Sequence, residues 1–156
     1  MSESVSKIDG IGTRRNASGT EVSNFEERTR FVRFYAAEAI AKGDAVCIDV
    51  ATSTYGYGNS IKKADSGTPG ISCAIGVAAE AISNGASGPI QVGGLCDFAK
   101  LLDTGDSPGH LVAASGTAGS MTLVAGVTDL PCALIVVEGT ATNANSTVFL
   151  LNPANL

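Results

Sequence analysis

The sequence predicts an all-β protein: a small β-barrel or sandwich of short strands with an extended N-terminal arm. Three observations lead to this class. The 156 residues include 19 glycines and no tryptophan, and only 16% are charged, against roughly 25% in typical globular domains. Short apolar, β-branched runs recur along the chain. Clusters of Gly, Pro, Asn, Asp and Ser separate these runs, as is typical of strands joined by tight turns.

The first 28 residues differ from the rest because they are polar, contain three glycines and show no sustained apolar period. We expect residues 1–28 to form an arm that is disordered alone and orders against a partner. Residues 29–156 are expected to form a single β-rich domain. A chain of this length can bury a core without disulfides or metals.

Ten strands are expected in this domain, each an apolar or β-branched run bounded by turn residues. In chain order they are Thr29–Ala37, Ala45–Val50, Ser60–Ala64, Ser72–Ala79, Pro89–Val92, Leu95–Leu101, His110–Ala114, Ser120–Val124, Ala133–Glu138 and Thr147–Leu151.

The segment that contains the first of these strands also fits a helix. Asn24 and Glu27 have the spacing of a capping box, apolar residues follow near helical spacing, and Gly43 stands where a helix would stop. A helix over Asn24–Lys42 is therefore an alternative to the first strand.

A short phrase occurs twice: AAEAIAKG at Ala36–Gly43 and AAEAISNG at Ala78–Gly85, 42 residues later. The second copy follows CAIGV, which is a poor helix sequence, so a shared conformation favours the extended form. We interpret the phrase as a strand end and turn used twice. In each copy an isoleucine closes the end of the core, a glycine allows the chain to reverse, and a glutamate points to water. These residues are Ile40, Gly43 and Glu38 in the first copy, and Ile82, Gly85 and Glu80 in the second.

Four cysteines are widely spaced, so no CxxC pair exists to begin a zinc site. Each lies in an apolar, strand-like segment, which favours buried thiols that pack as small hydrophobic groups. Disulfides or a metal site are the alternatives. The residues are Cys47, Cys73, Cys96 and Cys132.

One string has the form of a catalytic motif. Asp103-Thr-Gly after two leucines resembles the active-site loop of retropepsin-like aspartic proteases, in which each of two chains donates one aspartate. Asp106 follows the glycine, and its carboxylate would add repulsion to such a pair. The same string is a favourable turn by composition, and His110 is the only histidine. We therefore expect no enzyme and no cofactor, with a protease using Asp103 as the alternative.

The charges are unevenly placed. Residues 1–33 hold six of the 10 Lys/Arg and five of the 15 Asp/Glu, so the rest of the chain is acidic. An acidic body argues against nucleic-acid binding, which needs clustered basic residues. The longest apolar run, Leu130–Val137, is too short to span a bilayer, and the N-terminus lacks the pattern of a signal peptide. We expect a soluble protein made in a cytoplasm, with no membrane partner.

A series of motifs runs through about three quarters of the chain. It begins with A-x-E-A-I-x-x-G-D-x-V, which ends at Val46, and I-G-V-A-x-E-A-I-x-x-G at Ile75–Gly85. A Gly-flanked strand PIQVGGLCDF, the turn TGDSPGHLVAASGTAG and a final strand TVFLL follow. In this order the motifs resemble the small head-decoration, or cement, proteins of tailed bacteriophages.

The resemblance implies a structural protein of the virion that binds the outer surface of an icosahedral head and staples neighbouring major capsid subunits together. It implies the major capsid protein as partner, and self-association as a homotrimer, with a dimer as the alternative. The chain would be made in the host cytoplasm. A third class, a β-rich adhesin or tail-fibre module, would use the loop of Tyr55 and Tyr57 on a glycan. The candidate capsid-binding residues of the arm are Arg14, Arg15, Phe25, Arg28, Arg30 and Phe31.

Overall fold

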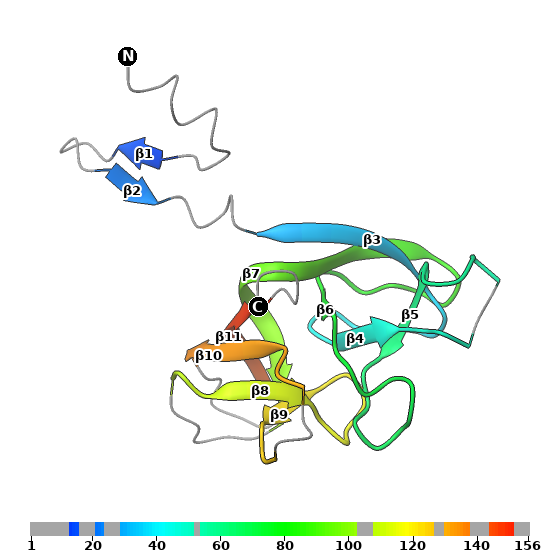
Figure 1. The fold of residues 1–156 in the computed structure, drawn as a ribbon. Helices are drawn as coiled ribbons and strands as arrows, with labels where there is room; N and C mark the ends of the chain where they lie inside the picture. Colours follow the sequence, from blue (N-terminus) through cyan, green and yellow to red (C-terminus); the bar gives the residue numbers. More distant parts are fainter. Residues whose placement is uncertain are drawn as a thin grey trace.

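The computed structural model describes residues 13–15, 21–23, 29–51, 54–102, 108–126, 130–137 and 144–151. All regular elements among these residues are strands, which confirms the all-β class (Figure 1). The strands are β1 Thr13–Arg15, β2 Glu21–Ser23, β3 Arg30–Ala36, β4 Ala45–Ile48, β5 Ser60–Lys63, β6 Gly76–Ala78, β7 Ser87–Leu101, β8 Leu111–Ala114, β9 Met121–Leu123, β10 Ala133–Val137 and β11 Ala144–Leu150.

The helix alternative is wrong over the described part of its range, because Arg30–Ala36 is the extended strand β3. Residues 24–28 lie outside the described residues. Within the arm, β1 and β2 pair antiparallel with each other.

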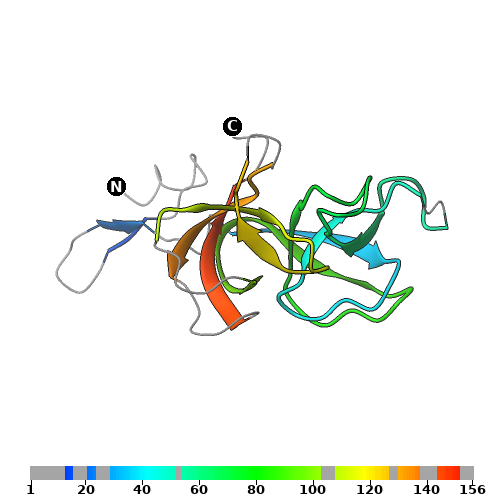
Figure 2. The same ribbon diagram turned by 90° about the horizontal axis from the view of Figure 1, so that it is seen from below.

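The strands after the arm close into two five-stranded rings that share β7. In the first barrel the order is β7, β3, β5, β4, β6 and back to β7, and in the second it is β7, β11, β10, β8, β9 and back to β7. Figure 2 shows the two lobes side by side, with β7 running through both. The expected barrel is therefore present twice in one body.

The sequence predicts two strands, Pro89–Val92 and Leu95–Leu101, where the structure has the single 15-residue strand β7. The reason lies in the two glycines between them. Gly94 has a φ of 86°, a conformation that glycine adopts at little cost, and the register against β3 shifts nearby, between Arg30 and Phe31. A bulge of this kind bends a strand without ending its pairing. The bend lets β7 leave one barrel and enter the other.

Each barrel has its own apolar core, set by the alternation of side chains along the strands. The first barrel encloses Ala36, Ile40, Val46, Ile61, Ala78, Ile82 and Ile90. The core of the second barrel, which includes Cys96, Leu101, Met121 and Ile135, also takes in residues of the first barrel. Those are Ala45 and Cys47 of β4 and Val77 of β6, whose side chains point out of the first barrel. The outer face of β4 and β6 is therefore covered by the second barrel.

The turn after Ile40 fastens the two barrels together. Lys100 of β7 donates its backbone N–H to the carbonyl of Gly43 at 3.1 Å, and its ammonium lies 2.5 Å from a carboxylate oxygen of Asp44. The other oxygen of Asp44 accepts the N–H of Ala41 at 2.8 Å. The ammonium of Lys42 lies 5.1 Å from the centre of the Phe98 ring, within the range of a cation–π contact.

The two copies of the repeated phrase bind each other. Ile40 and Ile82 exchange backbone hydrogen bonds of 2.9 and 2.8 Å, and both side chains are buried in the first core. The N–H of Gly43 bonds to the carbonyl of Ala78 at 2.9 Å, and the N–H of Gly85 bonds to that of Ala36 at 2.7 Å. Both glycines have positive φ, 88° and 82°.

The two copies are related by an approximate two-fold symmetry, because each of these backbone contacts has a counterpart 42 residues away in the sequence. The register pair Tyr35 with Ser87 in β3 and β7 corresponds to Val77 with Ala45 in β6 and β4.

The two glutamates of the repeated phrase differ from the expectation that both point to water. Glu80 is exposed, but an oxygen of Glu38 accepts the backbone N–H of Lys63 at 2.7 Å.

Replacing turn glycines by alanine separates two losses of unfolding free energy. One comes from the positive φ, and the other comes from contact of the new Cβ with neighbouring atoms. A Cβ on Gly43 would lie 2.4 Å from the carbonyl oxygen of Phe98, whereas one on Gly58 (φ 78°) would meet nothing within 4 Å. We expect Gly58→Ala to cost about 1 kcal/mol of unfolding free energy and Gly43→Ala about 3 kcal/mol, because backbone must also move. Gly85→Ala should fall between them, since its nearest neighbour is the hydroxyl of Tyr55 at 3.0 Å. Urea unfolding measures all three, and equal losses at Gly43 and Gly58 would contradict the close packing.

Candidate binding surface

The candidate arm residues fall mostly beyond what the structure describes. Phe25 and Arg28 lie outside the described residues, and for Arg14 and Arg15 only the backbone, in strand β1, is described. Arg30 and Phe31 are the first two residues of β3. They mark the point at which the arm joins the first barrel.

The first half of β3 is exposed on both of its faces. Its even-numbered residues point toward the first core and its odd-numbered residues point away, yet residues 30–33 are all exposed. Phe31 is 52% exposed and Val32 is 38% exposed. An apolar strand end that extends past the core it belongs to is available for contact with another molecule.

One edge of this strand half is also open among the described strands. β3 pairs along its length with β7, while β5 reaches only Tyr35 and Ala36. The opposite edge of Arg30–Phe34 has no strand beside it in the described part of the chain. Such an edge can accept a further strand from a partner, because its backbone already has the extended conformation of a strand.

The outer face of β3 is held rigid by local contacts. The guanidinium of Arg33 donates to the carbonyl of Ser87 at 3.0 Å and to its hydroxyl at 3.4 Å. Tyr35 stacks on Tyr55 with ring centres 4.6 Å apart and planes 8° apart. An aromatic ring beside a fixed guanidinium is a typical combination at protein interfaces. Arg33 and Tyr35 were not among the candidates expected from the sequence, and the available signal was the alternation of basic and aromatic residues in RFVRFY at Arg30–Tyr35.

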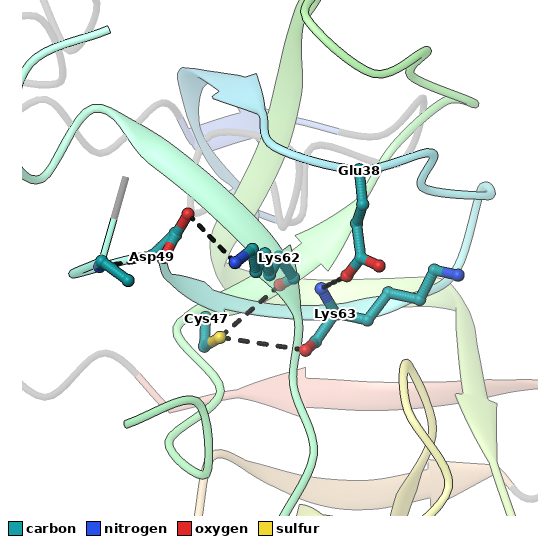
Figure 3. Close-up of polar contacts among 6 residues, drawn as sticks. Glu38, Cys47, Asp49, Lys62 and Lys63 are labelled. Carbon is teal, nitrogen blue, oxygen red and sulfur yellow. Dashed lines mark hydrogen bonds and ion pairs between the residues drawn. The ribbon is translucent and has the colours of Figure 1, made fainter. Parts of the chain in front are cut away.

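A polar cluster on β4 and β5 has a structural role (Figure 3). The carboxylate of Asp49 is buried, lies 3.4 Å from the ammonium of Lys62 and accepts the N–H of Ala51 at 3.0 Å. The Cys47 thiol donates to the carbonyls of Lys62 and Lys63 at 3.6 and 3.9 Å. These contacts join neighbouring strands of the first barrel.

The cysteines are free thiols, and three of the four are buried as expected. Burial raises the pKa of Cys47 and of Cys96 to about 11 and that of Cys132 to about 12, because a thiolate loses solvation in the core. Cys73 is the exception to the expected burial, since it is exposed. Its thiol is the one that solvent can reach in the folded protein.

The remaining sequence candidates are scattered. Asp103 lies outside the described residues, and His110 is exposed. In the tyrosine loop, Tyr55 is half-buried in its stack on Tyr35, whereas Tyr57 is 79% exposed. Across the described ranges, no group of three or more His, Cys, Asp or Glu side chains could hold a metal ion. The same ranges contain no helix long and apolar enough to cross a membrane.

No model of a known protein family matches the chain, and no curated protein matches it either. Function is therefore inferred from the residues and from their arrangement in space.

A thiol reagent at pH 8 should react rapidly with one cysteine, Cys73, and with the other three only when the chain unfolds. Cys73→Ser should remove the rapid phase alone, and a second rapid thiol would contradict the described core.

The three buried thiols also predict a loss of stability in alkali. Their folded pKa values lie above the ordinary value of 9.0, so their contribution to the free energy of unfolding is complete below pH 9. This contribution is lost as the pH rises toward 11–12, because the thiols of the unfolded chain ionise first.

Proposed function

We propose that the protein is a capsid decoration, or cement, protein that binds the outside of an icosahedral phage head. In this role it staples neighbouring major capsid subunits through its arm and the exposed half of β3. The order of sequence motifs from Tyr35 to about Leu151 supports the class. The proposal concerns a structural protein of the virion and not an enzyme, with self-association as a homotrimer.

The single observation that carries the binding mode is the exposed end of β3. Residues 1–28 lead directly into a strand half that offers Phe31 and Val32 to solvent and one open edge to a partner strand. A segment that orders on binding can cover a large area of a partner. Several such arms on one assembly would act together, so attachment would be far tighter than any single arm allows.

Two further contacts of the fold suit a protein that must resist force. The first barrel is closed by the two-way bonding of Ile40 and Ile82, and the Asp44–Lys100 contact ties it to the second. The shared strand β7 also carries load between the barrels through backbone hydrogen bonds.

Deleting residues 2–28 should abolish or strongly reduce binding to purified heads built from the major capsid protein of the same genome. The barrels should stay folded, because the deletion leaves β3 and both cores intact. Co-sedimentation of protein with heads measures binding, and circular dichroism checks the fold.

A point variant sharpens this test. Phe31→Ser should weaken head binding by about tenfold, as expected for removing one exposed aromatic anchor. Val50→Ser, at a site that is 63% exposed on the first barrel, is the matched control and should bind like the intact chain. Undiminished binding after the deletion would remove the arm's role, and no binding by the intact chain would refute the proposal.

A glycan-binding module is the second candidate, favoured by the exposure of Tyr57 beside the stacked pair Tyr35 and Tyr55. An exposed aromatic ring on a rigid base can stack on a sugar. A glycan screen with Tyr57→Ala as control separates the two, because that variant should leave head binding unchanged. The protease alternative predicts peptide cleavage that Asp103→Asn abolishes.

A further inference from the structure

The internal two-fold places two faces of the first barrel in equivalent positions, and the second barrel covers only one of them. The covered face consists of Ala45, Cys47 and Val77, which are 0%, 2% and 0% exposed inside the core of the second barrel. Displacement by 42 residues gives their counterparts, Ser87, Pro89 and Tyr35. We name these three residues together with Arg33 the uncovered face.

The uncovered face is partly open to solvent, with the ring of Tyr55 stacked on Tyr35. Tyr35 is 42% exposed, Arg33 and Ser87 are exposed, and Pro89 is half-buried. These residues lie in register on two paired strands, Arg33 opposite Pro89 and Tyr35 opposite Ser87. The covered face packs against an apolar surface of the second barrel. The uncovered face has the same backbone arrangement, so it can pack against a similar surface.

The second barrel carries an apolar row on its outward side that is only partly buried. Leu111 of β8 lies opposite Leu134 of β10, Leu134 opposite Phe149 of β11, and Phe149 opposite Leu95 of β7. Their neighbours in sequence belong to the core, so these four side chains point outward. Leu111 is 41% and Leu95 38% exposed, and the other two are half-buried. We name this row the outer stripe.

The charges beside the two surfaces are complementary. Arg33 on the uncovered face makes no ion pair with any described residue. Asp97 is exposed, lies two residues after Leu95 in β7 and also makes no ion pair with a described residue. Contact between two outer stripes would not bring Arg33 and Asp97 together. Contact between a stripe and an uncovered face instead brings Arg33 toward Asp97, which favours this pairing.

We propose that two copies of this chain associate head to tail, with the uncovered face of one copy on the outer stripe of the next. Each copy has one surface of each kind, so the contact is heterologous, and a rotation that closes on itself gives a ring such as the proposed trimer. The inference builds on the self-association that is part of the proposed function and names the surfaces that produce it. It concerns the purified chain without capsids, so its failure and the failure of head binding are separate results.

Two single substitutions test the contact on the full chain. Tyr35→Glu places a carboxylate on the uncovered face, and Leu95→Glu places one on the outer stripe. Each should weaken self-association by about 100-fold or more, because an uncompensated charge would be buried against apolar groups. Val50→Glu, at a 63% exposed site on neither surface, is the control and should assemble like the unchanged chain. Native mass spectrometry and sedimentation measure the assembly, and thermal unfolding shows that each variant is folded.

Mixing the two variants gives the decisive result. Each variant retains the surface that the other has lost, so an equimolar mixture should form pairs of one copy each and nothing larger. A contact of stripe with stripe would instead leave Tyr35→Glu fully assembled, which would overturn the proposal. A monomeric unchanged chain, or a mixture that stays monomeric, would overturn it as well.

The charge pair provides an independent measurement. Arg33→Asp and Asp97→Arg should each weaken assembly by about tenfold, and the chain that carries both substitutions should recover most of the loss. Additive losses in the double variant would show that the two residues do not meet, and the proposed pairing would be wrong.

Discussion

The exchange of backbone hydrogen bonds between Ile40 and Ile82 is the contact on which the first barrel depends. Each isoleucine supplies a donor and an acceptor that would otherwise be buried without a partner, which is costly in a core. The turns that follow, at Gly43 and Gly85, send the chain into β4 and β7. The positions of four of the barrel's five strands, β3, β4, β6 and β7, are therefore linked to one short pairing.

The two copies of the phrase are nearly identical, but their surroundings are not. In the first copy the turn carries Lys42 and is followed by Asp44, and these residues contact Phe98 and Lys100 of the second barrel. In the second copy the equivalent residues are Asn84 and Ala86, and both are exposed. The backbone geometry is thus used twice, while the side chains decide which copy binds the second barrel.

This asymmetry connects the fold to the proposed role. One side of the first barrel is occupied by the second barrel, so the chain becomes one body with a shared strand and adjoining cores. The other side holds the exposed end of β3 and the residues around Tyr35 and Arg33. An arm that joins at that end and a rigid body behind it are the parts that a molecular staple requires.

The sequence by itself determined the all-β class, most strand positions and the burial of three cysteines, because alternation and turn composition are local properties. It also named Arg30 and Phe31 as candidate binding residues, which stays a prediction. Only the tertiary structure decided that Gly94 bends one strand through two barrels, that the repeated phrases bind each other, and that Cys73 is exposed. The same holds for the outer stripe, whose residues come from four strands far apart in sequence. Such features depend on register between distant segments, which local patterns do not specify.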